Sequence, residues 1–167
     1  MDETPKRVVV GKEEGEKVWM GGMGVDSKLW GNDTGGALSI VEHPIDPGRL
    51  VPPHMHTKED EYSYVIEGEI GARIGNRILQ AGPGCYVLKP RNVPHTFWNA
   101  GPKKARILEI ISPAGFEHFF KKAEAVFAPG ADRNQLAPLA GSYEVRLEWW
   151  DWVPELTKKY NLKLLGD

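Results

Sequence analysis

Three histidines and one glutamate stand at spacings that could hold a metal ion. His54 and His56 are two residues apart, Glu61 follows five residues after His56, and His95 comes further along the chain. In a β-strand, residues i and i+2 point to the same face, about 6.6–6.8 Å apart. Two imidazoles at that spacing can converge on one ion. With the third histidine and the carboxylate they form a nitrogen and oxygen donor set that suits one divalent transition metal: Fe, Mn, Ni, Co, Cu or Zn.

The residues around these candidates form two motifs. They read Gly48-x5-His54-x-His56-x4-Glu61-x6-Gly68 and Gly84-x5-Pro90-x-Asn92-x2-His95-x3-Asn99. Both resemble the two motifs of the cupin superfamily at every spacing, except that Asn92 stands where the family usually has glycine. Asn is the non-glycine residue that best tolerates positive φ, so this difference is compatible with the motif. The chain resembles a small single-domain cupin (monocupin), and its C-terminal segment resembles that of quercetinase-like members of the cupin_2 type.

The resemblance implies a metal-dependent enzyme. His54, His56, Glu61 and His95 would be the ligands, and Glu61 would also be the catalytic residue, either as a permanent ligand or by swinging between coordination and proton abstraction. The leading expectation is a dioxygenase that uses O2 on a small phenolic or enolisable substrate, such as a flavonol or diketone. The alternatives are a redox-neutral cyclase, isomerase or lyase acting on polyketide- or sugar-type substrates, and a non-catalytic cupin that binds a small molecule.

Strand parity adds candidates for the cavity wall. Ser63 and Val65 share parity with Glu61 and are expected to line the cavity, with ordinary filling of the barrel interior as the alternative. Phe97 is expected there for the same reason, since it shares parity with His95. Asn99 is a fourth candidate, either hydrogen-bonded behind the ligands or a simple turn residue.

Parity also makes a prediction for the segment that leads into the first motif. Leu50 and Pro52 share parity with His54, so they are expected on the inward face. His43 lies beside Pro44 in a predicted turn and is expected to be solvated.

Short apolar segments separated by Gly- and Pro-rich turns predict an all-β fold, the double-stranded β-helix or jelly-roll β-barrel that cupins adopt. Outside the motifs, strands are expected at 7–10, 16–20, 37–42, 70–74, 77–80, 85–89 and 105–112, with a tight hairpin at Gly75-Asn76. Helical periodicity follows at 115–128 and 151–160. The prediction is one domain with three regions: N-terminal strands and loops (1–36), barrel core (37–112) and a C-terminal helical extension and tail packing on the barrel (113–167).

Composition bounds the remaining properties. The 167 residues include 21 Lys and Arg against 23 Asp and Glu, a formal charge of −2, so no nucleic-acid partner is expected. No apolar run approaches the ~20 residues of a membrane helix, and no secretory signal is recognised. A single cysteine agrees with a reducing compartment, which predicts a cytoplasmic protein. Apolar residues on both faces of the strand after Glu61 predict a homodimer, and Trp149–Trp152 would cover the barrel or form a subunit contact.

Overall fold

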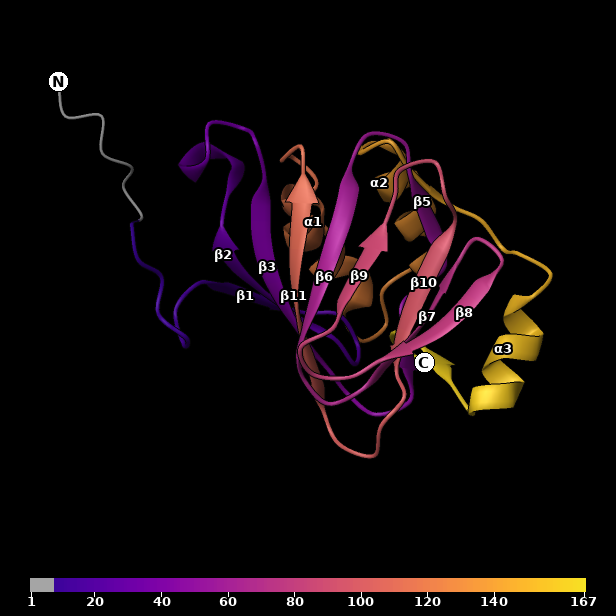
Figure 1. The fold of residues 1–167 in the computed structure, drawn as a ribbon. Helices are drawn as coiled ribbons and strands as arrows, with labels where there is room; N and C mark the ends of the chain where they lie inside the picture. The colour runs from indigo at the N-terminus through magenta and orange to yellow at the C-terminus, as the bar shows by residue number, and fades with distance from the viewer. Residues whose placement is uncertain (1–7) are drawn as a thin grey trace, which may run out of the picture.

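The computed structural model describes residues 8–167 as two facing β-sheets with helices behind and beside them in the view of Figure 1. Sheet A has the strand order β1 (Glu16–Trp19), β2 (Gly24–Leu29), β3 (Ser39–Ile45), β11 (Ala105–Ser112), β6 (Asp60–Glu67) and β9 (Tyr86–Lys89). Sheet B has the order β12 (Val145–Leu147), β5 (His54–His56), β10 (His95–Asn99), β4 (Arg49–Leu50) and β13 (Lys163–Leu164). Two further strands extend sheet B from β10: β7 (Ile70–Ile74) and β8 (Arg77–Ala81). The predicted jelly-roll β-barrel is confirmed.

The strands follow the alternation of their side chains. In β11, every second residue is buried and faces the space between the sheets, while the residues between them are partly exposed. The hairpin at Gly75-Asn76 joins β7 to β8 with Ile74 opposite Arg77, and Gly75 takes a φ of 56°. Asn92 takes a φ of 62°, the left-handed backbone that glycine would otherwise supply.

The N-terminal segment differs in several places from the expected elements. A strand was expected over 7–10; Arg7 lies outside the described residues, and 8–10 form no strand. Residues 1–7 of the predicted N-terminal region all lie outside the described residues, so the structure does not test that part of the prediction. Beyond them, β1 and β2 form a hairpin that joins β3, and a short 3-10 helix, η1 (Gly31–Asp33), precedes β3.

One hydrophobic core fills the space between the sheets. It contains Met20, Ile107 and Phe120, which come from the three predicted regions of the chain. Helix α1 (Glu117–Phe127) supplies Phe119, Phe120 and Phe127, and 3-10 helix η2 (Arg133–Gln135) leads into α2 (Leu136–Gly141), which adds Ala140. The helix expected over 115–128 is slightly shorter, since α1 begins at Glu117 and ends at Phe127.

A second cluster joins α3 (Val153–Tyr160) to the outer face of sheet B, on the side of the molecule where Figure 1 draws β7, β8 and β10. The cluster consists of Leu50, Trp98, Leu156 and Leu162. The inward placement expected for Leu50 is therefore wrong. The strand is interrupted after β4 by Pro52-Pro53, so strict alternation does not continue from Leu50 to His54.

The tryptophans expected to cover the barrel or form a subunit contact lie in different environments. Trp152 packs against the α3 cluster and lies under the guanidinium of Arg73, whose Cζ is 4.4 Å from the ring centre. Trp149 is 64% exposed. Among residues 8–167, none of the helices is both long enough and apolar enough to cross a membrane.

Candidate metal centre

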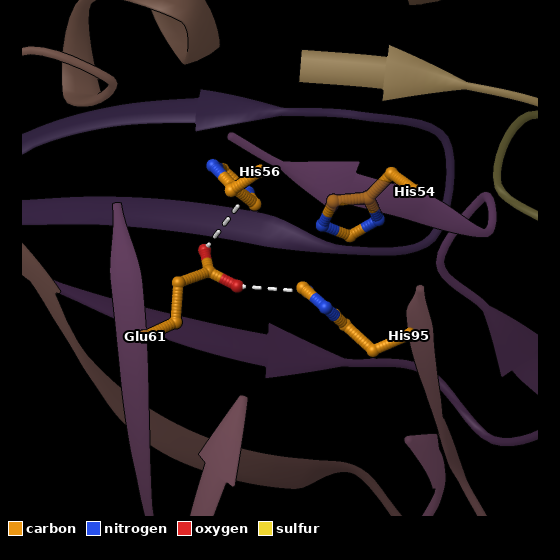
Figure 2. A group of neighbouring side chains, drawn as sticks. All are labelled: His54, His56, Glu61 and His95. Atoms are coloured by element: carbon orange, nitrogen blue, oxygen red, sulfur yellow. Dashed lines mark hydrogen bonds and ion pairs between the residues drawn. The ribbon is translucent and has the colours of Figure 1, made fainter. Parts of the chain in front are cut away.

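The four predicted ligands meet between the two sheets (Figure 2). His54, His56 and His95 come from neighbouring strands of sheet B, since β5 pairs with β10 and His54 lies opposite His95. Glu61 reaches them from β6 of sheet A. All four side chains are buried, and their ligand atoms lie within 4.8 Å of one another. The structure thus brings together residues that are separated by up to 41 positions, the difference between 54 and 95.

The proton positions on the histidine rings leave three lone pairs facing this point. Nδ1 of His54 lies 2.8 Å from the carbonyl of Pro52, and Nδ1 of His95 lies 3.0 Å from the carbonyl of Val93. Nδ1 of His56 lies 3.1 Å from Oε2 of Glu59. These oxygens accept, so each Nδ1 donates, and Nε2 is the ring nitrogen that remains to face the other ligands.

This arrangement fits a cation. Nε2 of His56 is buried and has no hydrogen-bond partner in residues 8–167, although Oε1 of Glu61 is 3.4 Å away. Nε2 of His95 lies 3.0 Å from Oε2 of Glu61, so two acceptors face each other when His95 is neutral. Ligands at roughly 2.0–2.2 Å from one ion are themselves about 3.0–3.6 Å apart. Both distances fall in that range, and a divalent ion would satisfy the facing lone pairs.

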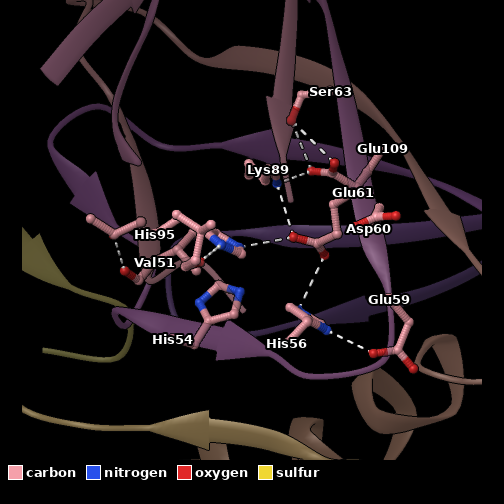
Figure 3. A network of polar contacts seen from close by, with 12 residues as sticks. Val51, His54, His56, Glu59, Asp60, Glu61, Ser63, Lys89, His95 and Glu109 are labelled. Atoms are coloured by element: carbon pink, nitrogen blue, oxygen red, sulfur yellow. Dashed lines mark hydrogen bonds and ion pairs between the residues drawn. The ribbon is translucent and has the colours of Figure 1, made fainter. Parts of the chain in front are cut away.

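A buried lysine and a second glutamate lie behind Glu61 (Figure 3). Nζ of Lys89, on β9, is 3.3 Å from Oε2 of Glu61 and 2.6 Å from Oε2 of Glu109, on β11. The hydroxyl of Ser63 donates to Glu109 at 3.1 Å. Lys89 and Glu109 are each 1% exposed, so one ammonium compensates two buried carboxylates.

This network separates the acidities of the two carboxyl groups. Burial alone would raise the pKa of Glu61, but the charge of Lys89 and the neighbouring His56 and His95 hold that pKa well below its ordinary value. Burial raises the pKa of Glu109 to about 7, and the opposing charge of Lys89 does not overcome it. Burial would lower the pKa of Lys89, yet Glu109 and Glu61 raise it above 10.5. Glu61 is therefore ionised at neutral pH, as a metal ligand must be.

Two of the ligand histidines, His54 and His95, are held neutral. Burial is the main cause that lowers the pKa of His54 well below 6.5, and the nearby His95 and His56 lower it further. Burial also lowers the pKa of His95, against the opposing effect of Glu61. Neutral imidazoles are the form that binds metals.

A cavity of about 60 Å³ opens beside the ligands. Its wall is mostly apolar and rich in phenylalanine from α1 and the segment before it. The lining residues are Met20, Met23, His43, Val51, Pro52, His54, Glu61, Phe97, Glu109, Phe116, Phe119, Phe120, Phe127, Leu136, Ala140, Val145, Leu147 and Leu165. The cavity thus touches the metal ligands at His54 and Glu61. Its other polar lining residues are His43 and Glu109, and the rest of the wall is hydrophobic, with side chains from both sheets and from α1 and α2.

The expected cavity residues divide into one that lines this space and three that do not. Phe97 lines it. Ser63 lies behind it, bonded to Glu109, and Val65 is buried in the core farther along β6. Asn99 holds a turn, because its Nδ2 donates to the carbonyls of Ile45 and Lys103 and its Oδ1 accepts from Gly101. Strand parity predicted the correct face of each strand, but not which positions along the strand reach the cavity.

Three polar residues of this region were not predicted to belong to the site. His43, expected to be solvated in a turn, is 2% exposed within β3 and lines the cavity. Glu109 occupies an inward position of β11 among isoleucines, and Lys89 shares the inward face of β9 with Val87. A charged residue at an inward position of an apolar strand was the available signal for Glu109 and Lys89.

Comparison with known proteins agrees with the fold and the motifs. A family model described as a cupin domain matches residues 42–111. A germin-like protein, subfamily T member 2, of Arabidopsis thaliana is 33% identical over 78 residues, which are 42% of this chain and 34% of that protein. The tetracenomycin polyketide synthase protein TcmJ of Streptomyces glaucescens is 31% identical over 80 residues, which are 48% of this chain and 52% of that protein. The matches therefore span about half of TcmJ and a third of the germin-like protein.

Among solved structures, an RmlC-like cupin from Shewanella frigidimarina superposes with a TM-score of 0.59. It is identical at 22% of positions, and the match covers 69% of this chain and 98% of that chain. At this identity the similarity shows the shared fold.

Proposed function

We propose that this chain, whose residues 42–111 match the cupin domain model, is a metal-dependent enzyme, a dioxygenase acting on a small phenolic or enolisable substrate. The observation that carries this proposal is the position of His54, His56, Glu61 and His95 at the wall of a phenylalanine-lined cavity. Fe, Mn, Ni, Co, Cu or Zn suits this donor set. When bound, such an ion would supply a Lewis acid that favours the deprotonated form of a substrate hydroxyl or enol.

Residues of the chain itself can carry out the proton transfer that the proposed reaction requires. Glu61 is ionised, and its carboxylate lies at the cavity wall, where it can accept the proton of a substrate hydroxyl. Lys89 holds this carboxylate in place from behind and compensates its charge. A low pKa makes Glu61 a weak base, so it can accept a proton only from a hydroxyl whose own acidity is raised in the site.

The cavity wall supports an apolar substrate. Phe116, Phe119 and Phe120 form part of the wall, and Phe116 packs edge-on against the His56 ring with centroids 4.4 Å apart. These rings exclude water from the reacting groups. Neither arginine nor lysine lines the cavity in the described part of the chain, so it offers a carboxylate or phosphate substrate no cationic partner.

The volume limits the size of the substrate. About 60 Å³ corresponds to room for roughly four to six water molecules, at 10–15 Å³ each on this measure. A cavity that binds one benzene ring measures roughly 150 Å³, so a short β-diketone or a single phenolic ring requires this cavity to widen, and a flavonol requires it to widen much further. We therefore place short diketones and single-ring phenols ahead of flavonols.

The test is oxygen consumption by protein stripped with a chelator and reloaded with Fe, Mn, Co or Ni. Acetylacetone, catechol and quercetin are the substrates. We expect uptake that requires the metal and is lost in Glu61→Gln, while His118→Ala, which changes a half-exposed histidine on α1, keeps it. Absence of uptake with every metal and substrate would rule out the dioxygenase.

A redox-neutral cyclase is the second candidate, and the sequence similarity to TcmJ, a polyketide synthase protein, favours a polyketide-type substrate for it. The same carboxylate, cavity and donor set could move protons on an enolisable polyketide-like substrate without oxygen. Turnover of such a substrate by zinc-loaded protein under argon would support the cyclase and count against the dioxygenase.

We also propose a homodimer formed through the outer face of sheet A. Tyr62, Ile66, Tyr86 and Leu88 expose 37–81% of their surface there, on β6 and on β9, the last strand of the sheet. Light scattering coupled to size exclusion, with Tyr86→Lys/Leu88→Lys as the disrupting variant, tests it. Location in the cytoplasm stays a prediction.

A further inference from the structure

His43 presents a polar ring to the cavity. It lies on β3, is 2% exposed and lines the cavity together with Phe97 and Phe120. Its ring packs edge-on against Phe120, with centroids 5.5 Å apart, and tilts against Phe97 at 6.3 Å. These contacts fix the plane of the imidazole.

The backbone sets the tautomer of this ring. Nδ1 of His43 lies 3.0 Å from the carbonyl oxygen of Gly24, which can only accept, so Nδ1 carries the proton. Burial lowers the pKa of His43 to about 4, so the ring is neutral at neutral pH. Nε2 then carries a lone pair, and no group in residues 8–167 donates to it.

The other polar side chains of the cavity wall are already engaged. His54 and Glu61 belong to the ligand set, and Glu109 accepts from Lys89 and Ser63. Within the stretch of chain that the structure describes, His43 is the cavity-lining side chain whose acceptor atom has no partner of its own. An unpartnered acceptor in an apolar wall favours a ligand that brings a donor.

We propose that His43 is a substrate-binding residue whose Nε2 accepts a hydrogen bond from a substrate hydroxyl. The ligand class is a small, uncharged molecule with two oxygens, one directed to the metal centre and a separate hydroxyl directed to β3. Single aromatic rings with two hydroxyl groups belong to this class. The inference rests on the proposed function, because it places the substrate in the same cavity.

The contribution of the second hydroxyl can be measured by replacing it with a methyl group of similar size. Resorcinol is compared with m-cresol, and hydroquinone with p-cresol, by anaerobic calorimetric titration of zinc-loaded protein. A methyl group is preferred in an apolar wall, whereas a hydroxyl is preferred only where it finds a partner. We expect at least one diol to bind about three- to tenfold more tightly than its cresol.

Two substitutions of His43 test whether this residue causes the preference for the diol over the cresol. In His43→Phe the hydroxyl loses its acceptor, and we expect the cresol to bind more tightly than the diol. In His43→Gln the amide can donate to Gly24 and accept from the ligand, so some of the diol preference should return. The control Phe119→Leu changes the apolar wall and should shift both affinities together, leaving their ratio as in the wild type.

The outcomes separate this inference from the proposed function. Cresols that bind wild-type protein as tightly as the diols, and only when zinc is present, would overturn the role of His43 and support the metal-centred cavity. A diol preference that survives in His43→Phe would also overturn it. If no phenol binds zinc-loaded protein, the proposed substrate class and the role of His43 both fall.

Discussion

Lys89 places its buried ammonium 3.3 Å from the carboxylate of Glu61, the one ligand that comes from sheet A. This contact makes the charge of the metal centre depend on a residue outside it. Glu109 shares the same ammonium, so three ionisable side chains form one unit beneath the cavity.

Lys89→Met should destabilise the protein. It leaves Glu61 and Glu109 buried without their counter-charge, and breaking a buried ion pair in this way costs about 3–5 kcal/mol. Urea unfolding of metal-free protein at neutral pH measures the change in the free energy of unfolding. The double variant Lys89→Met/Glu109→Gln should recover some of the loss, because it removes one stranded carboxylate. A wild-type unfolding midpoint for Lys89→Met would contradict the pairing.

Metal binding should raise the melting temperature of chelator-treated protein. Zinc at 100 times its dissociation constant stabilises by about 2.7 kcal/mol, which corresponds to roughly 5–10 °C for a chain of this length. Differential scanning calorimetry with and without zinc checks this. His56→Ala and His95→Ala should lose the shift, and His118→Ala should keep it. An equal shift in all four proteins would place zinc elsewhere.

The buried His43 should make stability depend on pH. Its pKa is lowered from 6.5 to about 4 by burial, so between these two pH values the unfolded chain binds a proton at His43 that the folded protein does not bind. Its contribution is fully present above pH 6.5 and falls as the pH drops towards 4, by about 3 kcal/mol in total. Metal-free His43→Gln should lose less stability than wild type between pH 7 and 4 in urea titrations. Parallel pH profiles for the two proteins would contradict the neutral, buried ring.

Glu117 should stabilise the start of α1 above its ordinary pKa. Its carboxylate accepts from the amides of Gly31 at 2.9 Å and Gly115 at 2.6 Å. Burial would raise the pKa of Glu117, but these hydrogen bonds lower it below 4.5. The contribution is therefore present above pH 4.5 and is lost as the pH falls through the lower, folded value. Glu117→Gln should cost about 1–3 kcal/mol at pH 7 and progressively less in acid, as read from urea titrations at each pH.

Gly71→Ala should loosen the contact between sheet B and α3. A Cβ at Gly71 would overlap the ring of Trp98, which is fully buried in the cluster that holds this helix. Overpacking of this kind costs about 1–3 kcal/mol. Gly82→Ala is the matched control, since its Cβ would meet nothing within 4 Å. Equal unfolding midpoints for both variants would show that the ring moves aside freely.

The sequence predicted those features of the site that depend on local spacing. The ligand positions, the hairpin at Gly75-Asn76 and the tolerance of Asn92 for positive φ follow from residue types at fixed intervals. Prolines caused two of the errors. Pro44 suggested a turn, yet it lies within β3 opposite Arg106, and Pro52-Pro53 changed the direction of the strand after Leu50.

Other features depend on pairing between distant segments. The contact between Lys89 and Glu109 requires β9 and β11 to flank β6, and neither strand shows its neighbour in its own sequence. The position of Ser63 behind Glu109 follows from the same register, in which the two residues lie directly opposite each other. Alternation can assign a side chain to the interior, but only the sheet order decides what it meets there.

Strand β12 pairs with β5, placing Val145 opposite His56 and Leu147 opposite His54. The backbone that carries two of the ligands is therefore completed by a segment made some ninety residues later, the interval between 56 and 145. During synthesis on the ribosome, the edge of β5 that pairs with β12 stays unpaired until residue 147 has left the exit tunnel. Until then this edge can pair with other strands. The backbone that carries His54 and His56 is thus fully paired only after the strands that carry Glu61 and His95 have been made.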